Sequence, residues 1–364
     1  MRMKRFLRRA APLALAAALL LAGCQNEIPA PTSSEEERLL VGFSMATLKE
    51  DRWLRDRDIF SAKAKQEGID VLITNANNDA DRQYEQVADM VEQGVDVLVI
   101  APHDCDNSAR CVGLAKRAGI PVISYDRLVK NADVDVYISF DNYKVGELQG
   151  KAILEAVPEG GYILLNGSED DSNSQMYHQG CMDQLQPAID AGQIQIVGET
   201  WVQDWRRETA FAFTSDVLRD KGDRVNAVIA ANDSLAWAAI DALSEAQRMD
   251  QVKVVGHDAD LAACQRIVVG TQLMTVYKPI PDLVDKTIEA CKLLAEGKEI
   301  DGEKTIDDGT YQVPYWMIDV IAVTKENIDD TVIKDGFHLK EDVYRQGVIG
   351  PRGIAPWACH FLLQ

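Results

Sequence analysis

The chain has 364 residues, of which 46% are hydrophobic and 26% are charged, and its formal net charge is −20 at pH 7. This composition is typical of a folded globular protein and excludes extensive disorder. The strongly acidic balance excludes nucleic acid as an expected partner, because its phosphates would be repelled.

The N-terminus has the pattern of a secretory signal. The cationic stretch MRMKRFLRR precedes the apolar stretch AAPLALAAALLLA, which is short for a membrane span. It ends in LAGC, which resembles the bacterial lipobox, so we expect residues 1–23 to be a cleaved signal peptide and Cys24 to be acylated. The alternative is an ordinary signal peptide with an incidental cysteine. Residues 24–37, rich in Pro, Ser and Glu, are predicted to be a flexible lipidated stalk.

From Leu39 onward, apolar runs alternate with amphipathic helical patterns. LLVGFSMA, DVLITNA and DVLVIAPH each precede such a pattern, and Gly68, Gly94 and Gly119 stand where the three helices would end in a left-handed cap. The alternation resumes with GYILLNGS, IQIVGETWV, VNAVIAAND and VKVVGHDAD. Repeated strand–helix units with short connections predict an α/β fold of parallel sheets with helices on both faces.

Polar residues follow nearly every predicted strand. In doubly wound parallel sheets, ligands bind at the carboxyl ends of the strands. The segments at those ends are TLKEDRW, YDR, FDN, SEDD, QDW, ANDS, HDAD and VYKP. We therefore expect them to form one polar cup.

The chemistry of these segments points to a sugar. Asp, Asn, Arg and Lys side chains offer directional hydrogen bonds for hydroxyl groups, and Trp53 and Trp205 offer flat apolar faces for a ring. The sequence has no glycine-rich phosphate loop of the GxGxxG or Walker type, and no GxSxG or HExxH motif. These observations predict a binding protein without cofactor rather than an enzyme.

Eight stretches between about Leu39 and His338 stand in a specific order: DRWLRDRDIF, GVDVLVI, YDR, DVYISFDNYKVGELQ, ANDS, GHDADLAACQRI, GTQLMTVYKPI and DTVIKDGFH. Together they resemble the D-xylose-binding proteins of bacterial ABC transporters, which are part of the ribose/galactose-type periplasmic sugar-binding family. The resemblance implies the type I periplasmic binding protein fold, in which two doubly wound parallel-sheet domains are joined by a three-strand hinge and close over one sugar.

The resemblance also implies domain boundaries. The expected N-terminal sugar-binding domain is 38–142 plus 279–311, the C-terminal one is 143–278 plus 312–340, and residues 341–364 form a tail without a family equivalent. The chain would cross between the domains just after Asp141 and Asn142, near Lys278 and Pro279, and around 311–316.

Carried over by motif, the resemblance implies ten contacts with the sugar: Arg52, Trp53, Asp126, Arg127, Asp141, Asn142, Trp205, Asn232, Asp258 and Lys278. These coincide with the strand-end residues chosen on chemical grounds. Several positions depart from the family pattern, and Cys105 and Cys111 occupy a loop that usually lacks cysteines. His257, beside Asp258, stands where the family carries glutamine, and the stretch around Trp205 matches loosely, so Trp201 competes with it as a sugar platform.

Two segments carry potential metal ligands, but neither predicts a metal site. In NANNDADRQ, Arg82 and Ala88 stand where a calcium loop needs glycine and glutamate, which favours a loop with a helix N-cap. In HDCDNSARC the ligand spacing is wider than in usual zinc sites. Besides Cys24 the chain has Cys105, Cys111, Cys181, Cys264, Cys291 and Cys359. Export permits disulfides, and Cys105 with Cys111 would close a small loop, but the sequence does not fix the pairing.

The resemblance implies a monomeric, lipid-anchored receptor that captures a monosaccharide, with D-xylose favoured, and delivers it to an ABC permease and its ATPase. Its place would be the periplasm or the outer face of the cytoplasmic membrane. Two alternatives stay open: a sensing subunit for a membrane histidine kinase, or a receptor for ribose, glucose or galactose. A sugar-responsive repressor is disfavoured, because the lipobox stands where a helix-turn-helix would be.

Overall fold

The computed structural model describes residues 38–302 and 304–345. The predicted signal peptide, Cys24, the stalk and most of the predicted tail, including Cys359, lie outside the described residues. Among the described helices, none is long and apolar enough to span a membrane.

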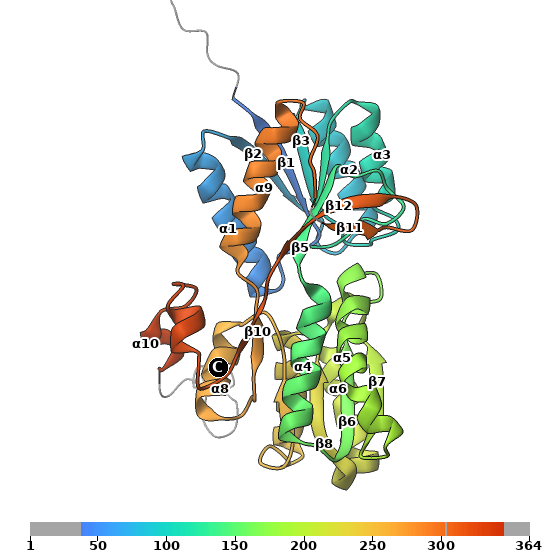
Figure 1. Cartoon of the computed structure of the whole chain (residues 1–364), viewed down its shortest axis with the longest axis vertical. Helices are drawn as coiled ribbons and strands as arrows, with labels where there is room; N and C mark the ends of the chain where they lie inside the picture. Colours follow the sequence, from blue (N-terminus) through green and yellow to red (C-terminus); the bar gives the residue numbers. More distant parts are fainter. Residues whose placement is uncertain (1–37, 303, 346–364) are drawn as a thin grey trace, which may run out of the picture. The chain divides into compact units, whose positions relative to one another are not determined.

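The described strands form two larger sheets and a small pair (Figure 1). The first sheet has the order β11-β12-β5-β4-β3-β1-β2 and the second has the order β7-β6-β8-β9. The strands of the first sheet are β1 (Leu40–Met45), β2 (Asp70–Asn75), β3 (Val97–Ala101), β4 (Val122–Tyr125), β5 (Val136–Phe140), β11 (Lys304–Asp307) and β12 (Gln312–Ile318). Those of the second sheet are β6 (Gly160–Asn166), β7 (Ile194–Trp201), β8 (Val225–Ala230) and β9 (Lys253–Val255), and β10 (Thr275–Tyr277) pairs with β13 (Ile321–Val323).

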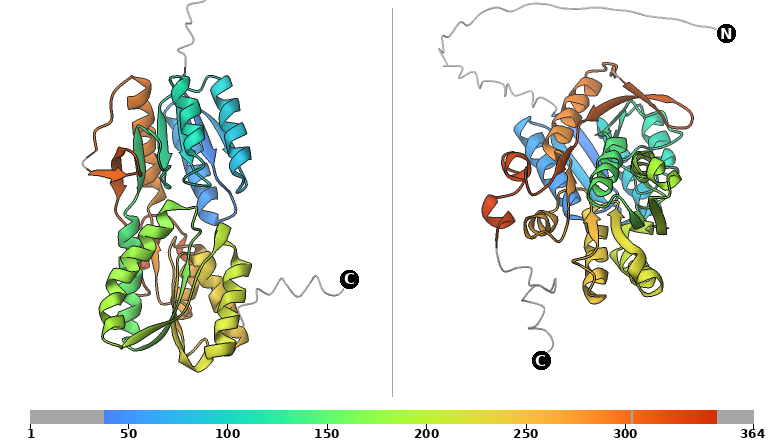
Figure 2. Two further views of the ribbon diagram at one scale, coloured as in Figure 1. Left: turned by 90° about the vertical axis from the view of Figure 1, so that its right-hand side faces the viewer. Right: turned by 60° about the horizontal axis from the view of Figure 1, so that its bottom comes forward.

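Helices cover both faces of the first sheet. The sheet and these helices are together called the first lobe. Its helices are α1 (Asp51–Gln66), α2 (Ala80–Glu92), α3 (Ala109–Arg117) and α9 (Ile280–Ala295). Figure 2 shows α9 on one face and α2 and α3 on the other. Strand β3 explains this, because all its residues are buried and they alternate between two hydrophobic clusters. A parallel strand buried on both faces is what its uninterrupted apolar sequence predicted.

The second sheet and the helices around it form the second lobe. These helices are α4 (Asn142–Ala156), α5 (Ser172–Asp190), α6 (Arg207–Lys221), α7 (Asp233–Glu245) and α8 (Leu261–Val269). Helix α4 packs against α5, and α6 packs against α7. All described pairings within this sheet are parallel, as the strand–helix repetition predicted. After β13, the described residues contain two more short elements, the helical turn η3 (Asp329–Ile333) and the helix α10 (Lys340–Val343).

The helix ends follow the sequence signals. Gly68, Gly94 and Gly119 have φ of 72°, 75° and 77°, the left-handed conformation that ends the first three helices as predicted. Asp79 caps α2, because its side chain accepts hydrogen bonds from the backbone N–H groups of Asp81 and Arg82. The NANNDADRQ segment is therefore the polar loop and helix cap that its residues favoured.

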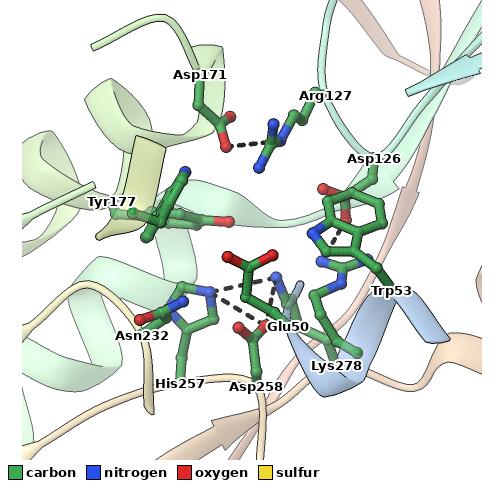
Figure 3. Close-up of a pocket in the computed structure, with 12 residues that line it drawn as sticks. Glu50, Trp53, Asp126, Arg127, Asp171, Tyr177, Asn232, His257, Asp258 and Lys278 are labelled. Atoms are coloured by element: carbon green, nitrogen blue, oxygen red, sulfur yellow. Dashed lines mark hydrogen bonds and ion pairs between the residues drawn. The ribbon is translucent and has the colours of Figure 1, made fainter. Parts of the chain in front are cut away.

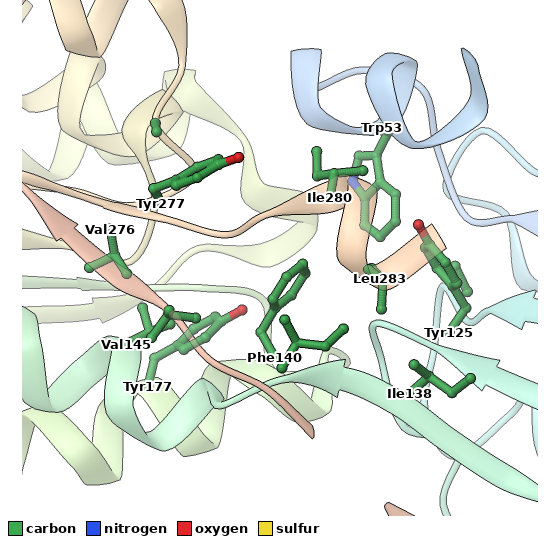
Figure 4. Packing of buried hydrophobic residues seen from close by; sticks show 14 of the residues in the cluster. Trp53, Tyr125, Ile138, Phe140, Val145, Tyr177, Val276, Tyr277, Ile280 and Leu283 are labelled. Carbon is green, nitrogen blue, oxygen red and sulfur yellow. The ribbon is translucent and has the colours of Figure 1, made fainter. Parts of the chain in front are cut away.

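The chain passes between the two sheets three times in the described residues: from β5 to α4, from β10 to α9 and from β12 to β13. Figure 4 shows apolar residues of the first two passages, including Phe140, Val145, Val276 and Ile280, packed in one cluster. The third passage falls at Asp319 and Val320, later than the expected 311–316. The reason is that β12 pairs with β5 in the first sheet, so 312–318 lies there and not beside the second sheet. The remaining domain boundaries stay a prediction.

Candidate functional site

A pocket lies at the carboxyl ends of the strands of both sheets (Figure 3). The space between its lining atoms is about 290 Å³ when the part open to solvent is counted. Its lining brings together eight of the ten predicted contacts, Arg52, Trp53, Asp126, Arg127, Trp205, Asn232, Asp258 and Lys278, and adds four residues that were not predicted, Glu50, Asp171, Tyr177 and His257.

Three ion pairs organise the charges of the pocket. Arg52 Nη1 lies 2.8 Å from Asp126 Oδ2, Arg127 Nε lies 2.7 Å from Asp171 Oδ2, and Lys278 Nζ lies 2.9 Å from Asp258 Oδ1. All six side chains are buried. Charges that are paired in this way tolerate burial, and their remaining donors and acceptors stay available for a polar ligand.

Asp126 takes an unusual backbone conformation at the end of β4. Its φ is 61°, which a non-glycine residue adopts only when its surroundings hold it there. Its carbonyl oxygen accepts hydrogen bonds from Tyr137 Oη, Ser139 Oγ and Asn173 Nδ2. Burial raises the pKa of the Asp126 carboxyl, but the charges of Arg52, Lys278 and Arg127 outweigh burial and lower that pKa, so the group is ionised at neutral pH.

Asp258 is held in a similar way in the second lobe. Its φ is 99°, and its N–H donates to the carbonyl of Val276. Burial alone would raise the pKa of the carboxyl. His257, Lys278 and Arg52 lower it by more than burial raises it, so the pKa lies well below its usual range. Burial also lowers the pKa of His257 to about 3, so its ring is neutral. His257 Nε2 lies 3.2 Å from the ammonium of Lys278 and 3.3 Å from Asp258 Oδ1.

Two tryptophans line the pocket. Trp53 is buried at the start of α1, with the guanidinium of Arg52 4.2 Å from its ring centroid. Trp205 ends the short turn η1 (Gln203–Trp205). It can enter the pocket because residue 167 is glycine: a Cβ there would lie 2.2 Å from Trp205 Cη2. Trp201, the competing candidate, lies outside the lining and packs against the His178 ring instead.

Asp141 and Asn142, the other two predicted contacts, lie outside the pocket lining. Helix α4 begins directly after β5, so Asp141 becomes its N-cap and accepts from the Lys144 N–H. Asn142 is buried, and its Nδ2 is placed by Tyr137 Oη, Ser139 Oγ and Asn173 Oδ1. Both side chains therefore form hydrogen bonds within the protein and lie outside the pocket lining, where the prediction had placed them.

The added residues come from predicted strand ends or from a packed helix. Asp171 belongs to SEDD and Glu50 to TLKEDRW, two of the segments that the strand-end rule identified. Tyr177 lies on α5, which approaches α4 closely because Gly146 and Gly180 lack side chains that would clash with backbone atoms. Its ring centroid lies 4.6 Å from that of His257. No strand-end signal marks Tyr177.

The cysteines are not paired in the described residues. Cys105, Cys111, Cys181, Cys264 and Cys291 are all free and buried. The Cys105–Cys111 disulfide, which the sequence left open, is absent from the structure, and burial raises the pKa of both thiols to about 11.

Comparison with known proteins identifies the family. A model of the periplasmic binding protein domain matches residues 41–299. The chain is 44% identical to the D-xylose-binding periplasmic protein of Haemophilus influenzae, with 86% of this chain and 94% of that protein covered. It is 41% identical to the D-xylose-binding periplasmic protein of Escherichia coli, with 89% and 98% covered.

A solved structure supports the same conclusion. The carbohydrate transporter solute-binding protein of Chloroflexus aurantiacus, in complex with D-glucose, superposes with a TM-score of 0.79 at 28% identity, covering 83% of this chain and 97% of that one. The predicted fold is thereby confirmed, and so is the prediction of a binding protein rather than an enzyme. With its two lobes, three chain passages and strand-end pocket, the chain belongs to the periplasmic binding protein family and has the type I fold.

Proposed function

We propose that the protein is an extracytoplasmic receptor for a monosaccharide, D-xylose being the favoured ligand. The observation that carries the proposal is the composition of the pocket, in which three buried ion pairs and two tryptophans surround one small space. Ionised groups form strong hydrogen bonds with hydroxyls, and aromatic faces pack against the C–H face of a sugar ring. The two D-xylose-binding relatives support the choice of sugar.

The proposed sugar contacts are the predicted residues that line the pocket, together with Asp171. Trp53 and Trp205 would pack against the ring, and Asp126, Asp171, Asn232 and Asp258 would accept from hydroxyls. Arg52, Arg127 and Lys278 would donate to hydroxyl oxygens. Two further ring nitrogens, Trp205 Nε1 and His257 Nδ1, are available for hydrogen bonds with the sugar, because they are buried without a hydrogen-bond partner among the described residues.

Binding would proceed by closure of the lobes. The first lobe supplies Arg52, Trp53, Asp126 and Arg127, and the second lobe supplies Asn232 and Asp258. A sugar that contacts both sets does so only when the lobes are together, so its binding free energy favours the closed state. The closed form would then be recognised by an ABC permease, whose ATPase drives import. The lipobox-like LAGC supports anchoring through Cys24, which would keep the receptor in the periplasm or on the outer face of the cytoplasmic membrane.

Calorimetric titration of the mature, unlipidated chain tests the ligand. D-xylose, ribose, arabinose, glucose and galactose would be titrated separately. One-to-one binding that is tightest for D-xylose supports the proposal, preference for another aldose replaces the named sugar, and no heat with any sugar refutes it. Anchoring is tested apart from this, by comparing detergent partitioning of the natural chain with that of Cys24→Ser after expression in a bacterium that processes lipoproteins.

A further inference from the structure

Glu50 stands at the start of α1 and places its side chain in the pocket. It is the residue before α1, at the N-cap position, but its side chain makes no capping hydrogen bond. The carboxylate instead lines the pocket beside Trp53 and Arg127. Figure 3 shows it pointing into the space between the Arg127–Asp171 pair and the Lys278–Asp258 pair.

Among the carboxylates that line the pocket, Glu50 stands apart because it has no ion-pair partner in the described residues. Asp126, Asp171 and Asp258 are each paired at 2.7–2.9 Å with an arginine or a lysine. Glu50 Oε2 is buried and has no hydrogen-bond partner in the described residues. A buried acceptor without a partner is costly for a folded protein, so its place in a binding pocket calls for a partner from outside the chain.

The electrostatics of the pocket agree with this. Burial raises the pKa of Glu50, and Arg127 only partly counteracts burial. Arg127 directs its Nε to Asp171 and its Nη1 to the carbonyl of Pro102, 3.3 Å away, and it forms no ion pair or hydrogen bond with Glu50 in the described residues. What the Glu50 carboxylate lacks is therefore a hydrogen-bond donor on the ligand side.

We propose that Glu50 accepts a hydrogen bond from one ring hydroxyl of the bound aldose and is thereby a specificity-determining residue of this receptor. This inference rests on the proposed function. A sugar that carries the hydroxyl satisfies the buried carboxylate, whereas a sugar without it leaves Glu50 desolvated and unpaired. Sites that hydrogen-bond a hydroxyl reject analogues lacking it much more strongly than apolar pockets do.

The test pairs changes in the protein with changes in the ligand. The parent chain, Glu50→Leu and Glu50→Gln would be titrated with D-xylose and with its single-deoxy analogues at each ring hydroxyl. Leucine has a similar volume but no acceptor, and glutamine keeps an oxygen without the charge. Asp51→Asn is the matched control, because it removes an exposed carboxylate from the next position in the chain.

We expect Glu50→Leu to bind D-xylose about 10- to 100-fold more weakly than the parent, the range of one charge-assisted hydrogen bond. Glu50→Gln should fall between the two, and Asp51→Asn should match the parent. One deoxy analogue should lose affinity for the parent but lose little more in Glu50→Leu, which identifies the hydroxyl. Since Glu50 has no capping bond to lose, the variants should fold, which thermal melting would check.

The outcomes separate the two proposals. If the parent binds D-xylose and every Glu50 variant binds all analogues with the parent's affinities, the role of Glu50 is refuted while the receptor function stands. Equal loss of affinity in Glu50→Leu for D-xylose and all analogues also refutes a direct hydrogen bond. If the parent binds no aldose at all, the proposed function itself fails.

Discussion

Arg127 and Asp171 form an ion pair that joins the two lobes directly, with Nε of the arginine 2.7 Å from Oδ2 of the aspartate. Both side chains are buried, and neighbouring hydrogen bonds between the lobes run from Leu128 N–H to Ser172 Oγ and from Cys105 N–H to the carbonyl of Asp170. The segment 170–173 of the second lobe is therefore fastened to the first lobe beside the pocket. Charged groups that join the lobes are thus also among the proposed sugar contacts.

Breaking this pair should weaken sugar binding. Asp171→Asn keeps the side-chain oxygen that caps α5 but removes the charge, so the helix should persist while Arg127 loses its counter-ion. We expect D-xylose affinity to fall about 10- to 100-fold, because a buried charge-assisted contact is lost. Titration calorimetry measures this. Asp216→Asn, which breaks an exposed pair with Arg219, should leave affinity unchanged, and an unaltered affinity in Asp171→Asn would contradict the role of the pair.

The two neighbouring tryptophans offer a second comparison. Trp205→Ala should weaken D-xylose binding at least about tenfold, because it removes an apolar face from the pocket. Trp201→Ala removes a ring of the same kind that packs on His178 outside the lining, so affinity should stay within about twofold of the parent, since no contact in the pocket changes. Calorimetric titration of both variants with D-xylose measures the two affinities. Equal losses in the two would mean that Trp205 has no special place at the ligand.

Asp141 should matter for stability and not for binding. Asp141→Ala removes the N-cap of α4, which costs about 1 kcal/mol in the free energy of unfolding. Chemical denaturation measures that loss, and D-xylose affinity measured on the same sample should be unchanged. A large loss of affinity without loss of stability would return Asp141 to the set of ligand contacts.

His338 should make stability depend on pH. It is buried, with Nε2 2.7 Å from the carbonyl of Ala259 and Nδ1 3.2 Å from Arg55 Nη2. Burial lowers its pKa from 6.5 to about 4. The folded state then binds fewer protons than the unfolded state, so the contribution of His338 is complete above about pH 6.5 and is lost as the pH falls to about 4.

Comparison with His338→Gln isolates this effect, since His257 and the other titrating groups are common to both proteins. The variant should be less stable by about 1 kcal/mol at pH 7, where a buried hydrogen bond is lost. The difference in unfolding free energy should fall as the pH is lowered and change sign before pH 4, because a pKa shift from 6.5 to about 4 removes about 3 kcal/mol from the parent by that pH. Denaturant titrations at pH 7, 6, 5 and 4 provide the test, and a constant difference would contradict the assigned protonation.

The sequence predicted the architecture well, because buried parallel strands such as β3 have a composition and period of their own. It placed β12 with the wrong sheet. Its pairing with β5 is a contact between distant segments, and the local pattern of 312–318 does not reveal which sheet it joins.

For the pocket, the strand-end rule found the right loops, and eight of the ten predicted side chains line it, but the rule singled out Asp141 and not Asp171. Asp141 and Asp171 both follow a strand and cap a helix, but α4 starts directly after β5, whereas four residues separate β6 from Asp171, whose carboxylate also pairs with Arg127. Tyr177 depends on the close approach of α4 and α5, and Trp205 on the missing side chain of Gly167. Such effects arise from packing in three dimensions and have no signature in a short stretch of sequence.

The three passages of the chain between the sheets determine when the protein can fold during its synthesis. The first lobe draws on α9 and β12, and residues such as Ile280, Leu283 and Val284 belong to its hydrophobic cluster together with Val41 and Phe43. Its core therefore stays incomplete until the chain has been made as far as residue 318, when most of the protein has already left the ribosome. The second lobe differs, because its sheet and helices all lie between residues 142 and 269 and are made as one continuous stretch, so it can be completed while the first lobe still lacks α9 and β12.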